Sequence, residues 1–185
     1  MKTKTQIWTI PNILSFFRIA LIPAIVVSYI KQLVILCVTL IIVSGVTDLL
    51  DGFIARRFQM VTVLGKALDP VADKLTIGSI LFMIASKKPA LILLLSIFAL
   101  KEIIMGIEGL IIIKITGTTY SAKWYGKVTT LLLYLSSLLI IVWENMPQAL
   151  VHITFALCFG FVVFSLVMYS IRNFKVLKQL KTNKD

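Results

Sequence analysis

Four aspartates stand close together in this sequence, and their spacing is the first sign of chemistry. They are Asp48, Asp51, Asp69 and Asp73, within the stretch DLLDGFIARRFQMVTVLGKALDPVAD. On helices, the first two share a face because they are three residues apart, and the last two share a face because they are four apart. A short reversal between the two pairs would bring all four carboxylates to one place.

Four carboxylates crowded into a medium of low dielectric constant repel one another and need cations to compensate them. Hard divalent ions with oxygen ligands meet that need, and Mg²⁺ is the usual partner of phosphate chemistry. The alternative is that the acids are surface residues paired with nearby basic side chains, which are Arg56, Arg57, Lys66 and Lys74. Acids inside a membrane or at its edge are functional candidates by default, which favours a site.

Two small residues, Gly52 and Ala55, follow the first aspartate pair. Small side chains on that face would let a flat base or a ribose approach the backbone closely. Small residues are also favoured where membrane helices pack together, so both interpretations stay open.

The remaining reactive residues offer no competing site. Cys37 and Cys158 lie inside apolar runs without a neighbour at metal-ligand spacing, and are expected to be small buried hydrophobes. His152, the single histidine, lies in or beside an apolar run with no acidic neighbour. Lys101 and Glu102 are expected to form an internal ion pair.

The composition is typical of a membrane protein. Of 185 residues, 59% are hydrophobic and only 15% are charged, whereas soluble domains carry about a quarter charged residues. The mean hydropathy is +0.99. The net charge is +11, from 19 Lys and Arg against 8 Asp and Glu. The basic residues stand mostly at the ends of apolar runs, which indicates orientation toward an anionic leaflet and disfavours nucleic-acid binding.

Six apolar runs predict an all-α polytopic membrane protein with a single domain, residues 1–185. Each run is close to the roughly 20 residues that cross a bilayer. The expected spans lie at about 12–29, 33–58, 69–86, 90–115, 127–143 and 150–171. Residues 1–10 are expected to lie on the membrane surface ahead of a retained first span, and residues 173–185 to form a basic cytoplasmic tail.

Two boundaries have clear local signals. Pro70 suits the first position of a helix, with Asp69 as its N-cap. The segment 116–126, with Gly, Thr and Ser, is expected to be a loop.

Six spans would place both termini on one side of the membrane. That side would hold most of the basic residues near the membrane, which are Lys2, Lys4, Arg56, Arg57, Lys66, Lys114, Lys123, Lys127 and those of the tail. The opposite side would hold only Lys31, Lys87 and Lys88. Because Lys and Arg concentrate on the cytoplasmic side, the termini and the aspartates are expected to face the cytoplasm from a multi-pass protein of the cell membrane.

The aspartate stretch resembles the signature of the CDP-alcohol phosphotransferases. The pattern D-x2-D-G-x2-A-R-x8-G-x3-D-x3-D is matched at eight fixed positions, which are Asp48, Asp51, Gly52, Ala55, Arg56, Gly65, Asp69 and Asp73. Eight fixed residues with fixed gaps are far more specific than a lone Gly-rich motif. The stretches PNILSFFR, LDPVADK and SAKWYGKVTT look similar to phosphatidylglycerophosphate synthases and to the related cardiolipin synthases.

The resemblance implies a fold and a metal centre. Family members have six membrane helices around a polar cavity that faces the cytoplasm, and they are often homodimers. Asp48, Asp51 and Asp69 would bind two divalent ions, Mg²⁺ or Mn²⁺. Asp73 would contribute to that site and act as the general base.

The resemblance also implies a reaction, in which an alcohol displaces CMP from a CDP-linked lipid. The nucleotide would contact the signature, at Asp48, Gly52, Ala55, Arg56 and Gly65. With CDP-diacylglycerol as donor and sn-glycerol 3-phosphate as acceptor, the acceptor phosphate needs cations. The candidates are Arg18, Arg57, Lys123 and Lys127, each of which also fits positive-inside anchoring.

Other functions remain open at this stage. A cardiolipin synthase would use phosphatidylglycerol as the acceptor, and serine or inositol phosphate rank lower. A cation transporter would line a path with acids near the bilayer midplane, whereas these acids lie near a basic edge. A non-catalytic membrane scaffold would have no need of all four aspartates.

Overall fold

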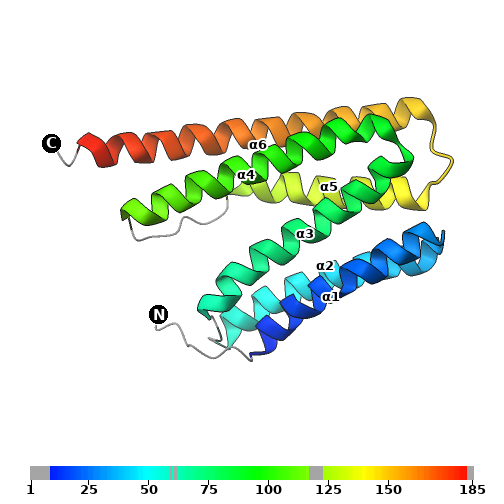
Figure 1. Ribbon diagram of the computed structural model, residues 1–185, viewed down its shortest axis with the longest axis horizontal. Coiled ribbons are helices and arrows are strands. Elements are labelled where there is room, and N and C mark those ends of the chain that lie inside the picture. The colour runs from blue at the N-terminus through cyan, green and yellow to red at the C-terminus, as the bar shows by residue number, and fades with distance from the viewer. Residues whose placement is uncertain (1–8, 59, 61, 117–122, 183–185) are drawn as a thin grey trace. The chain divides into compact units, whose positions relative to one another are not determined.

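The computed structural model describes residues 9–58, 60, 62–116 and 123–182. Six long helices account for nearly all of that part (Figure 1), and they are α1 (Ile10–Ile30), α2 (Val34–Arg57), α3 (Val63–Lys87), α4 (Ile92–Thr116), α5 (Trp124–Val142) and α6 (Gln148–Thr182). A short 3₁₀ turn, η1 (Pro89–Leu91), precedes α4. The prediction of an all-α protein is confirmed. The proposed surface segment lies, up to residue 8, outside the described residues.

Four of the described helices are long and apolar enough to cross a membrane, and they are α1, α2, α5 and α6. The other two carry charged residues along most of their length, at positions 66, 69, 73, 74 and 87 of α3 and at positions 101, 102, 108 and 114 of α4. Charged side chains in a membrane normally face the protein interior or a water-filled cavity. Six spans therefore stay a prediction that requires α3 and α4 to turn these charges away from lipid.

The helices fall into two compact units, and each is described by itself. The first unit contains Met1–Lys87 and Ile141–Glu144, and the second contains Lys88–Ile140 and Asn145–Asp185. In the first unit, α1 packs against both α2 and α3. In the second unit, α4 packs against α6.

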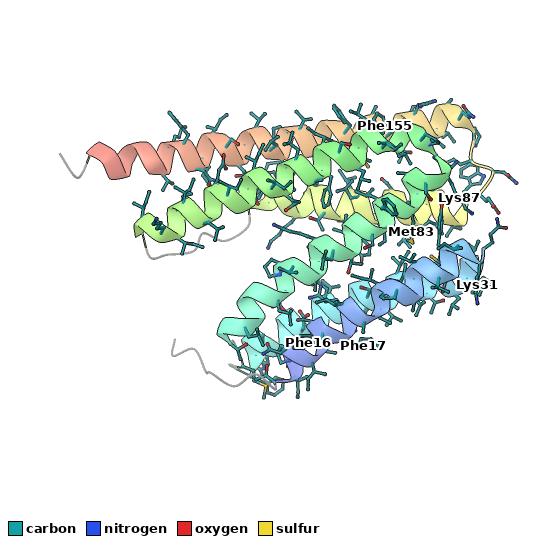
Figure 2. All side chains as sticks on the ribbon, in the orientation of Figure 1. Phe16, Phe17, Lys31, Met83, Lys87 and Phe155 are labelled. Atoms are coloured by element: carbon teal, nitrogen blue, oxygen red, sulfur yellow. The ribbon has the colours of Figure 1, made fainter. Side chains whose placement is uncertain are left out.

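One face of α1 is buried in the first unit. From Asn12 onward its buried residues recur every three or four positions, as one face of a helix requires. The buried residues are Pro11, Asn12, Ser15, Arg18, Leu21, Ile25 and Ser28. This face is polar in its first half and mostly apolar in its second half. Phe16 and Phe17 are exposed on the other side of the helix, where membrane lipid would cover them (Figure 2).

The start of α3 differs from the prediction. The helix begins at Val63, six residues before Asp69, and Pro70 lies inside it. Thr62 caps this earlier start, because its hydroxyl oxygen accepts a hydrogen bond from the Gly65 backbone N–H at 2.9 Å. Pro70 removes its own backbone N–H from the helix ladder and crowds the carbonyl four residues earlier, but the helix continues through it. The prediction that Asp69 caps a helix is therefore wrong.

The other boundaries differ by smaller amounts. Helix α1 begins at Ile10, two residues before the expected start, because Pro11 fits its first turn. Helix α5 begins at Trp124, so the expected loop 116–126 is shorter, and its residues 117–122 lie outside the described part. Helix α6 continues to Thr182 and so includes most of the expected basic tail.

Two predictions about buried groups are confirmed. Cys37 and Cys158 are buried and free. Lys101 is buried in α4, and its Nζ lies 2.7 Å from Glu102 Oε1, as expected of an internal ion pair. His152 is exposed on α6.

The two ends of the first unit carry different kinds of side chain. Figure 2 shows Lys31 and Lys87 at one end, and Phe16 and Phe17 at the other. Lys87 Nζ lies 4.7 Å from the centre of the Tyr29 ring, which ties the end of α3 to the end of α1. Both lysines were assigned to the non-cytoplasmic side, and the fold of this unit is consistent with that assignment.

Candidate active site

Three polar side chains follow one another at successive turns on the buried face of α1, at Asn12, Ser15 and Arg18. Each is no more than 1% exposed, so each needs a hydrogen-bonding partner inside the protein. All three find partners within or beside the signature stretch on α2 and α3. Helix α1 therefore supplies the part of the site that joins the other two helices.

Arg18 joins the first aspartate pair. Its Nη2 donates to Asp51 Oδ2 at 2.8 Å, and its Nη1 donates to Asp48 Oδ1. The side chains of Arg18 and Asp51 are only 2% and 3% exposed, whereas that of Asp48 is 41% exposed. The two aspartates share a face of α2, as their spacing predicts, with one carboxylate buried and the other open.

Ser15 joins α2 to α3. Its hydroxyl oxygen lies 2.5 Å from Asp69 Oδ1 and 3.4 Å from Asp51 Oδ2. It also lies 3.1 Å from the Pro11 carbonyl oxygen. A hydroxyl has one proton to donate, and the shortest distance assigns it to Asp69. Carboxylates from both aspartate pairs thus reach one oxygen of α1, and Asp73 lies one turn further along α3.

The charges in this cluster are unequal. Arg18 supplies one positive charge beside Asp48 and Asp51, and Asp69 adds a third carboxylate. An excess of negative charge in a poorly hydrated place is unfavourable, and carboxylate oxygens are the donors that hard divalent ions prefer. The donor chemistry therefore suits Mg²⁺ or Mn²⁺.

The arrangement of these donors is set by α1 in this conformation. Within the described residues, no three acidic, His or Cys side chains stand close enough to enclose one ion. Arg18 and Ser15 hold the carboxylates instead.

Asn12 joins α1 to the start of α3. Thr62 Oγ1 donates to Asn12 Oδ1 at 2.9 Å, while the same oxygen accepts the Gly65 N–H. Thr62 and Gly65 are both buried. Gly65 packs against the side chain of Asn12, and its expected contact with a nucleotide stays a prediction.

The small residues of the signature lie on α2 next to the aspartates. Gly52 and Ala55 are half-buried, and each lies four positions after an aspartate, Gly52 after Asp48 and Ala55 after Asp51, so they extend the same face toward the end of the helix. The side chain of Arg56 lies outside the described part, and Arg57 is exposed at the end of α2.

The other candidates for acceptor binding are in the second unit. Lys123 and Lys127 are exposed at the start of α5 and lie one turn apart. The Lys123 backbone N–H donates to the Tyr169 hydroxyl at 3.0 Å, which fixes this start against α6. Arg18, by contrast, has both terminal nitrogens on aspartates, so a contact from Arg18 to an acceptor phosphate stays a prediction.

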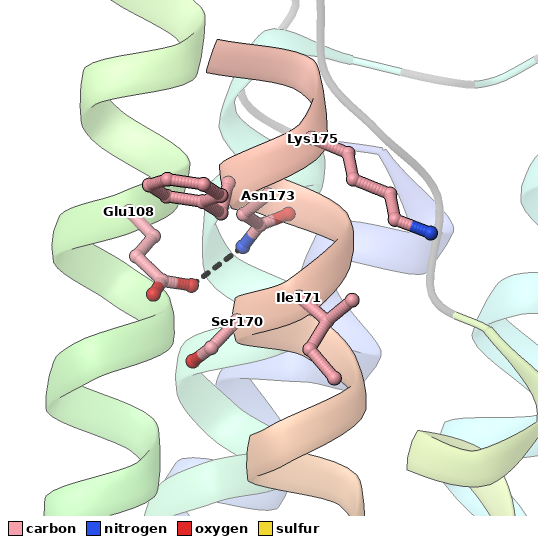
Figure 3. Close-up of a pocket in the computed structure, with 6 residues that line it drawn as sticks. Glu108, Ser170, Ile171, Asn173 and Lys175 are labelled. Carbon is pink, nitrogen blue, oxygen red and sulfur yellow. Dashed lines mark hydrogen bonds between the residues drawn. The ribbon is translucent and has the colours of Figure 1, made fainter. Parts of the chain in front are cut away.

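A pocket of about 440 Å³ lies between α4 and α6 (Figure 3). Its lining residues are Glu108, Ser170, Ile171, Asn173, Phe174 and Lys175. Asn173 Nδ2 donates to Glu108 Oε2 at 2.6 Å, and Arg172 donates to Asn173 Oδ1. The pocket includes none of the signature aspartates, so we do not assign it to the candidate active site.

Two residues of the site were not singled out from the sequence. Asn12 and Ser15 lie in the stretch PNILSFFR, which had been noted only for its likeness to other proteins. The sequence feature that could have identified them is the three-residue spacing of Asn12, Ser15 and Arg18 within an otherwise apolar run. Such spacing puts three polar groups on one face of a helix that has no other reason to carry them.

Known proteins share this arrangement of motifs. A family model described as CDP-alcohol phosphatidyltransferase matches residues 8–169, which include the polar face of α1 and the whole signature. The chain belongs to this family. The match runs through both units, so the family resemblance covers more than the aspartate cluster.

Individual relatives agree with the family match. A protein of Aquifex aeolicus named CDP-diacylglycerol–glycerol-3-phosphate 3-phosphatidyltransferase is 31% identical over 174 residues, which are 91% of this chain and 97% of the relative. A Rickettsia bellii protein with the same name is 42% identical over 81 residues, 42% of this chain and 45% of the relative. Human cardiolipin synthase (CMP-forming) is 47% identical over 77 residues, 41% of this chain and 25% of the relative. This chain thus spans less than half the length of two of these three CDP-alcohol phosphatidyltransferases.

Proposed function

We propose that this protein makes phosphatidylglycerophosphate from CDP-diacylglycerol and sn-glycerol 3-phosphate, and releases CMP. The observation that carries this proposal is the match to the A. aeolicus transferase over 97% of that protein. The buried face of α1 supports it, because Arg18 and Ser15 gather three of the four signature aspartates as a phosphate-handling site would need.

The proposed reaction replaces a phosphoanhydride bond with a phosphate ester bond. A bond forms between the acceptor hydroxyl oxygen and the phosphorus that carries diacylglycerol, and the bond from that phosphorus to the oxygen of CMP breaks. Asp73 takes the proton of the acceptor hydroxyl. The two small residues Gly52 and Ala55 leave room for the nucleotide beside Asp48 and Asp51.

A pair of divalent ions completes the proposed site. Asp48, Asp51, Asp69 and Asp73 would hold them, and the chemistry they supply is neutralisation of the pyrophosphate and of the leaving phosphate. Ser15 and Arg18 orient three of these carboxylates from α1. Lys123, Lys127 and Arg57 are proposed to bind the acceptor phosphate.

The proposed setting is a homodimer in the cell membrane with its site facing the cytoplasm. The excess of Lys and Arg on the side of the termini supports this orientation. CDP-diacylglycerol would enter from the lipid phase, and the water-soluble acceptor and CMP would exchange with the cytoplasm.

The second candidate function is cardiolipin synthesis, with phosphatidylglycerol as the acceptor. The identity to the human cardiolipin synthase is 47% over a short stretch. That stretch covers only 25% of the human protein, whereas the A. aeolicus match covers nearly the whole of that relative, so glycerol 3-phosphate is preferred.

The test is an acceptor panel. The purified protein receives CDP-diacylglycerol with Mg²⁺ and one acceptor at a time: glycerol 3-phosphate, phosphatidylglycerol, serine or inositol phosphate. Mass spectrometry of the lipid product identifies the acceptor that was used. Phosphatidylglycerophosphate as the main product supports the proposal, and cardiolipin as the main product replaces it with the second candidate.

A further inference from the structure

Gly65 lies unusually close to a side chain of another helix. A Cβ atom added to Gly65 would stand 2.6 Å from Asn12 Oδ1 and 3.0 Å from Thr62 Oγ1. The first distance is shorter than real Cβ contacts allow, and the second is tight. Replacing Gly65 by alanine therefore requires Asn12 to move.

Asn12 is poorly placed to move. Its side chain is buried, and its Oδ1 accepts the Thr62 hydroxyl proton at 2.9 Å. The Thr62 oxygen is held in turn by the Gly65 N–H, as the cap of α3. A shift of Asn12 would break its bond to Thr62 or displace the cap, and an unpaired polar group in a buried place is costly.

This contact sets the alignment of α1 against α3. Asn12 lies against Gly65, and one turn further Ser15 lies against Asp69. Both helices advance by about one turn between these two contacts. Helices α1 and α3 therefore run in the same direction, and the alignment of their turns is the same at both contacts. Displacing α1 at Asn12 would move Ser15, and Arg18 beyond it, away from the aspartates.

We propose that Gly65 is a positioning residue, and that its small size is required by the Asn12 side chain of α1. In this role Gly65 touches no substrate. It lets α1 approach closely enough for Ser15 and Arg18 to orient Asp69, Asp51 and Asp48. The inference concerns the site of the proposed function and rests on it for the activity that it affects.

A double-mutant cycle tests this proposal, with Gly65→Ala, Asn12→Ala and the double variant. Since alanine is the better helix former, Gly65→Ala should stabilise α3 unless it meets an obstacle. We expect Gly65→Ala to lower the unfolding temperature in detergent and to lower kcat at least about tenfold, within the usual range of coupling between residues in contact. In the Asn12→Ala background, Gly65→Ala should change kcat by less than about twofold.

The cycle separates positioning from nucleotide contact. If the glycine makes room for the nucleotide, Gly65→Ala will raise the KM for CDP-diacylglycerol by the same factor in both backgrounds, and the proposal is then overturned. The matched control is Gly160→Ala on α6, where an added Cβ meets nothing within 4 Å. This control should leave kcat and KM unchanged and should raise the unfolding temperature, because the added Cβ meets no obstacle in a helix.

The remaining outcomes are also decisive. If Gly65→Ala yields no folded protein but the double variant does, relief of the contact is demonstrated directly. If neither yields folded protein, removing Asn12 has not relieved the contact and the proposal fails. The unfolding temperatures need no substrate, so the cycle still tests the contact if the wild-type protein releases no CMP with any acceptor, which would count against the proposed function alone.

Discussion

Buried charges at this site are compensated across helices. Arg18 comes from α1, while the carboxylates it bonds, Asp48 and Asp51, come from α2. Because Arg18 and Asp51 are almost fully buried, each compensates the charge of the other inside the protein. Removing one member of a buried pair typically destabilises a protein by about 3–5 kcal/mol, since the other charge stays buried.

The first prediction concerns this pair. Arg18→Gln should lower the unfolding temperature of the detergent-solubilised protein in EDTA, because it leaves Asp51 without its cation. Added Mg²⁺ should raise the unfolding temperature of this variant by more than it raises that of the wild type, since a divalent ion supplies the missing charge. Differential scanning fluorimetry measures both effects.

The matched control replaces an arginine of the same protein that is exposed. Arg57→Gln, at the end of α2, should change the free energy of unfolding by no more than about 0.5 kcal/mol. Equal losses for the two arginine variants would show that the pairing of Arg18 with the aspartates contributes little to stability.

The second prediction separates the proposed general base from the proposed ligands. Asp73→Asn removes a proton acceptor with little change in volume, so CMP release should fall by at least about a hundredfold while CDP-diacylglycerol still binds. Asp51→Asn should weaken both nucleotide binding and metal binding. Near-normal turnover of Asp73→Asn at saturating acceptor would remove Asp73 from the role of base.

At the level of whole elements, α1 is the helix that organises the site. One face carries Asn12, Ser15 and Arg18 to the signature residues, and the other exposes Phe16 and Phe17. Substitutions at neighbouring positions should therefore have opposite consequences. The difference between neighbouring positions arises because one face of α1 is buried and the other is exposed.

The third prediction compares two neighbours on α1. Ser15→Ala removes the hydroxyl between Asp51 and Asp69, so it should destabilise the protein by about 1–3 kcal/mol and reduce CMP release. Phe16→Leu should leave both quantities nearly unchanged, because its side chain faces lipid. Unfolding temperature and initial rate are measured for both variants, and equal effects would mean that the buried face of α1 has no special part in the site.

The elements themselves were largely predictable from the sequence, because long apolar runs fix where helices form. The start of α3 was not, since Pro70 after Asp69 is a strong start signal and the actual cap, Thr62, is a common residue whose role depends on its contact with Gly65. The gathering of the aspartates followed from their spacing. The contacts of Arg18 and Ser15 with these aspartates were not predicted. The spacing of the polar residues on α1 indicates that they share one face, but it does not show which residues of another helix that face contacts.

At the level of the whole molecule, charge predicts the orientation. Lys31 and Lys87 lie at one end of the first unit, at the end opposite Phe16 and Phe17 (Figure 2). The aspartate cluster lies near the other end, within the first three turns of α1. Positive-inside bias therefore predicts that the cluster faces the cytoplasm.

The fourth prediction tests this orientation. Both endogenous cysteines are buried, so a new cysteine at an exposed position reports accessibility. Lys31→Cys should react with a membrane-impermeant maleimide in intact cells, whereas a C-terminal protease-cleavable tag should be cut only in inside-out vesicles. A tag that is protected in inside-out vesicles would contradict the six-span arrangement.

The most direct test of the proposed enzyme is CMP release from CDP-diacylglycerol by the purified protein, with glycerol 3-phosphate present or absent and with the metal controlled. We predict release only with the acceptor, loss of release in EDTA, and recovery on adding Mg²⁺ or Mn²⁺. Asp48→Asn, which alters the open carboxylate of the cluster, should lower the rate even with saturating metal. Full release by exhaustively chelated protein, or release at the same rate without acceptor, would contradict a metal-dependent phosphatidyl transfer at the four aspartates.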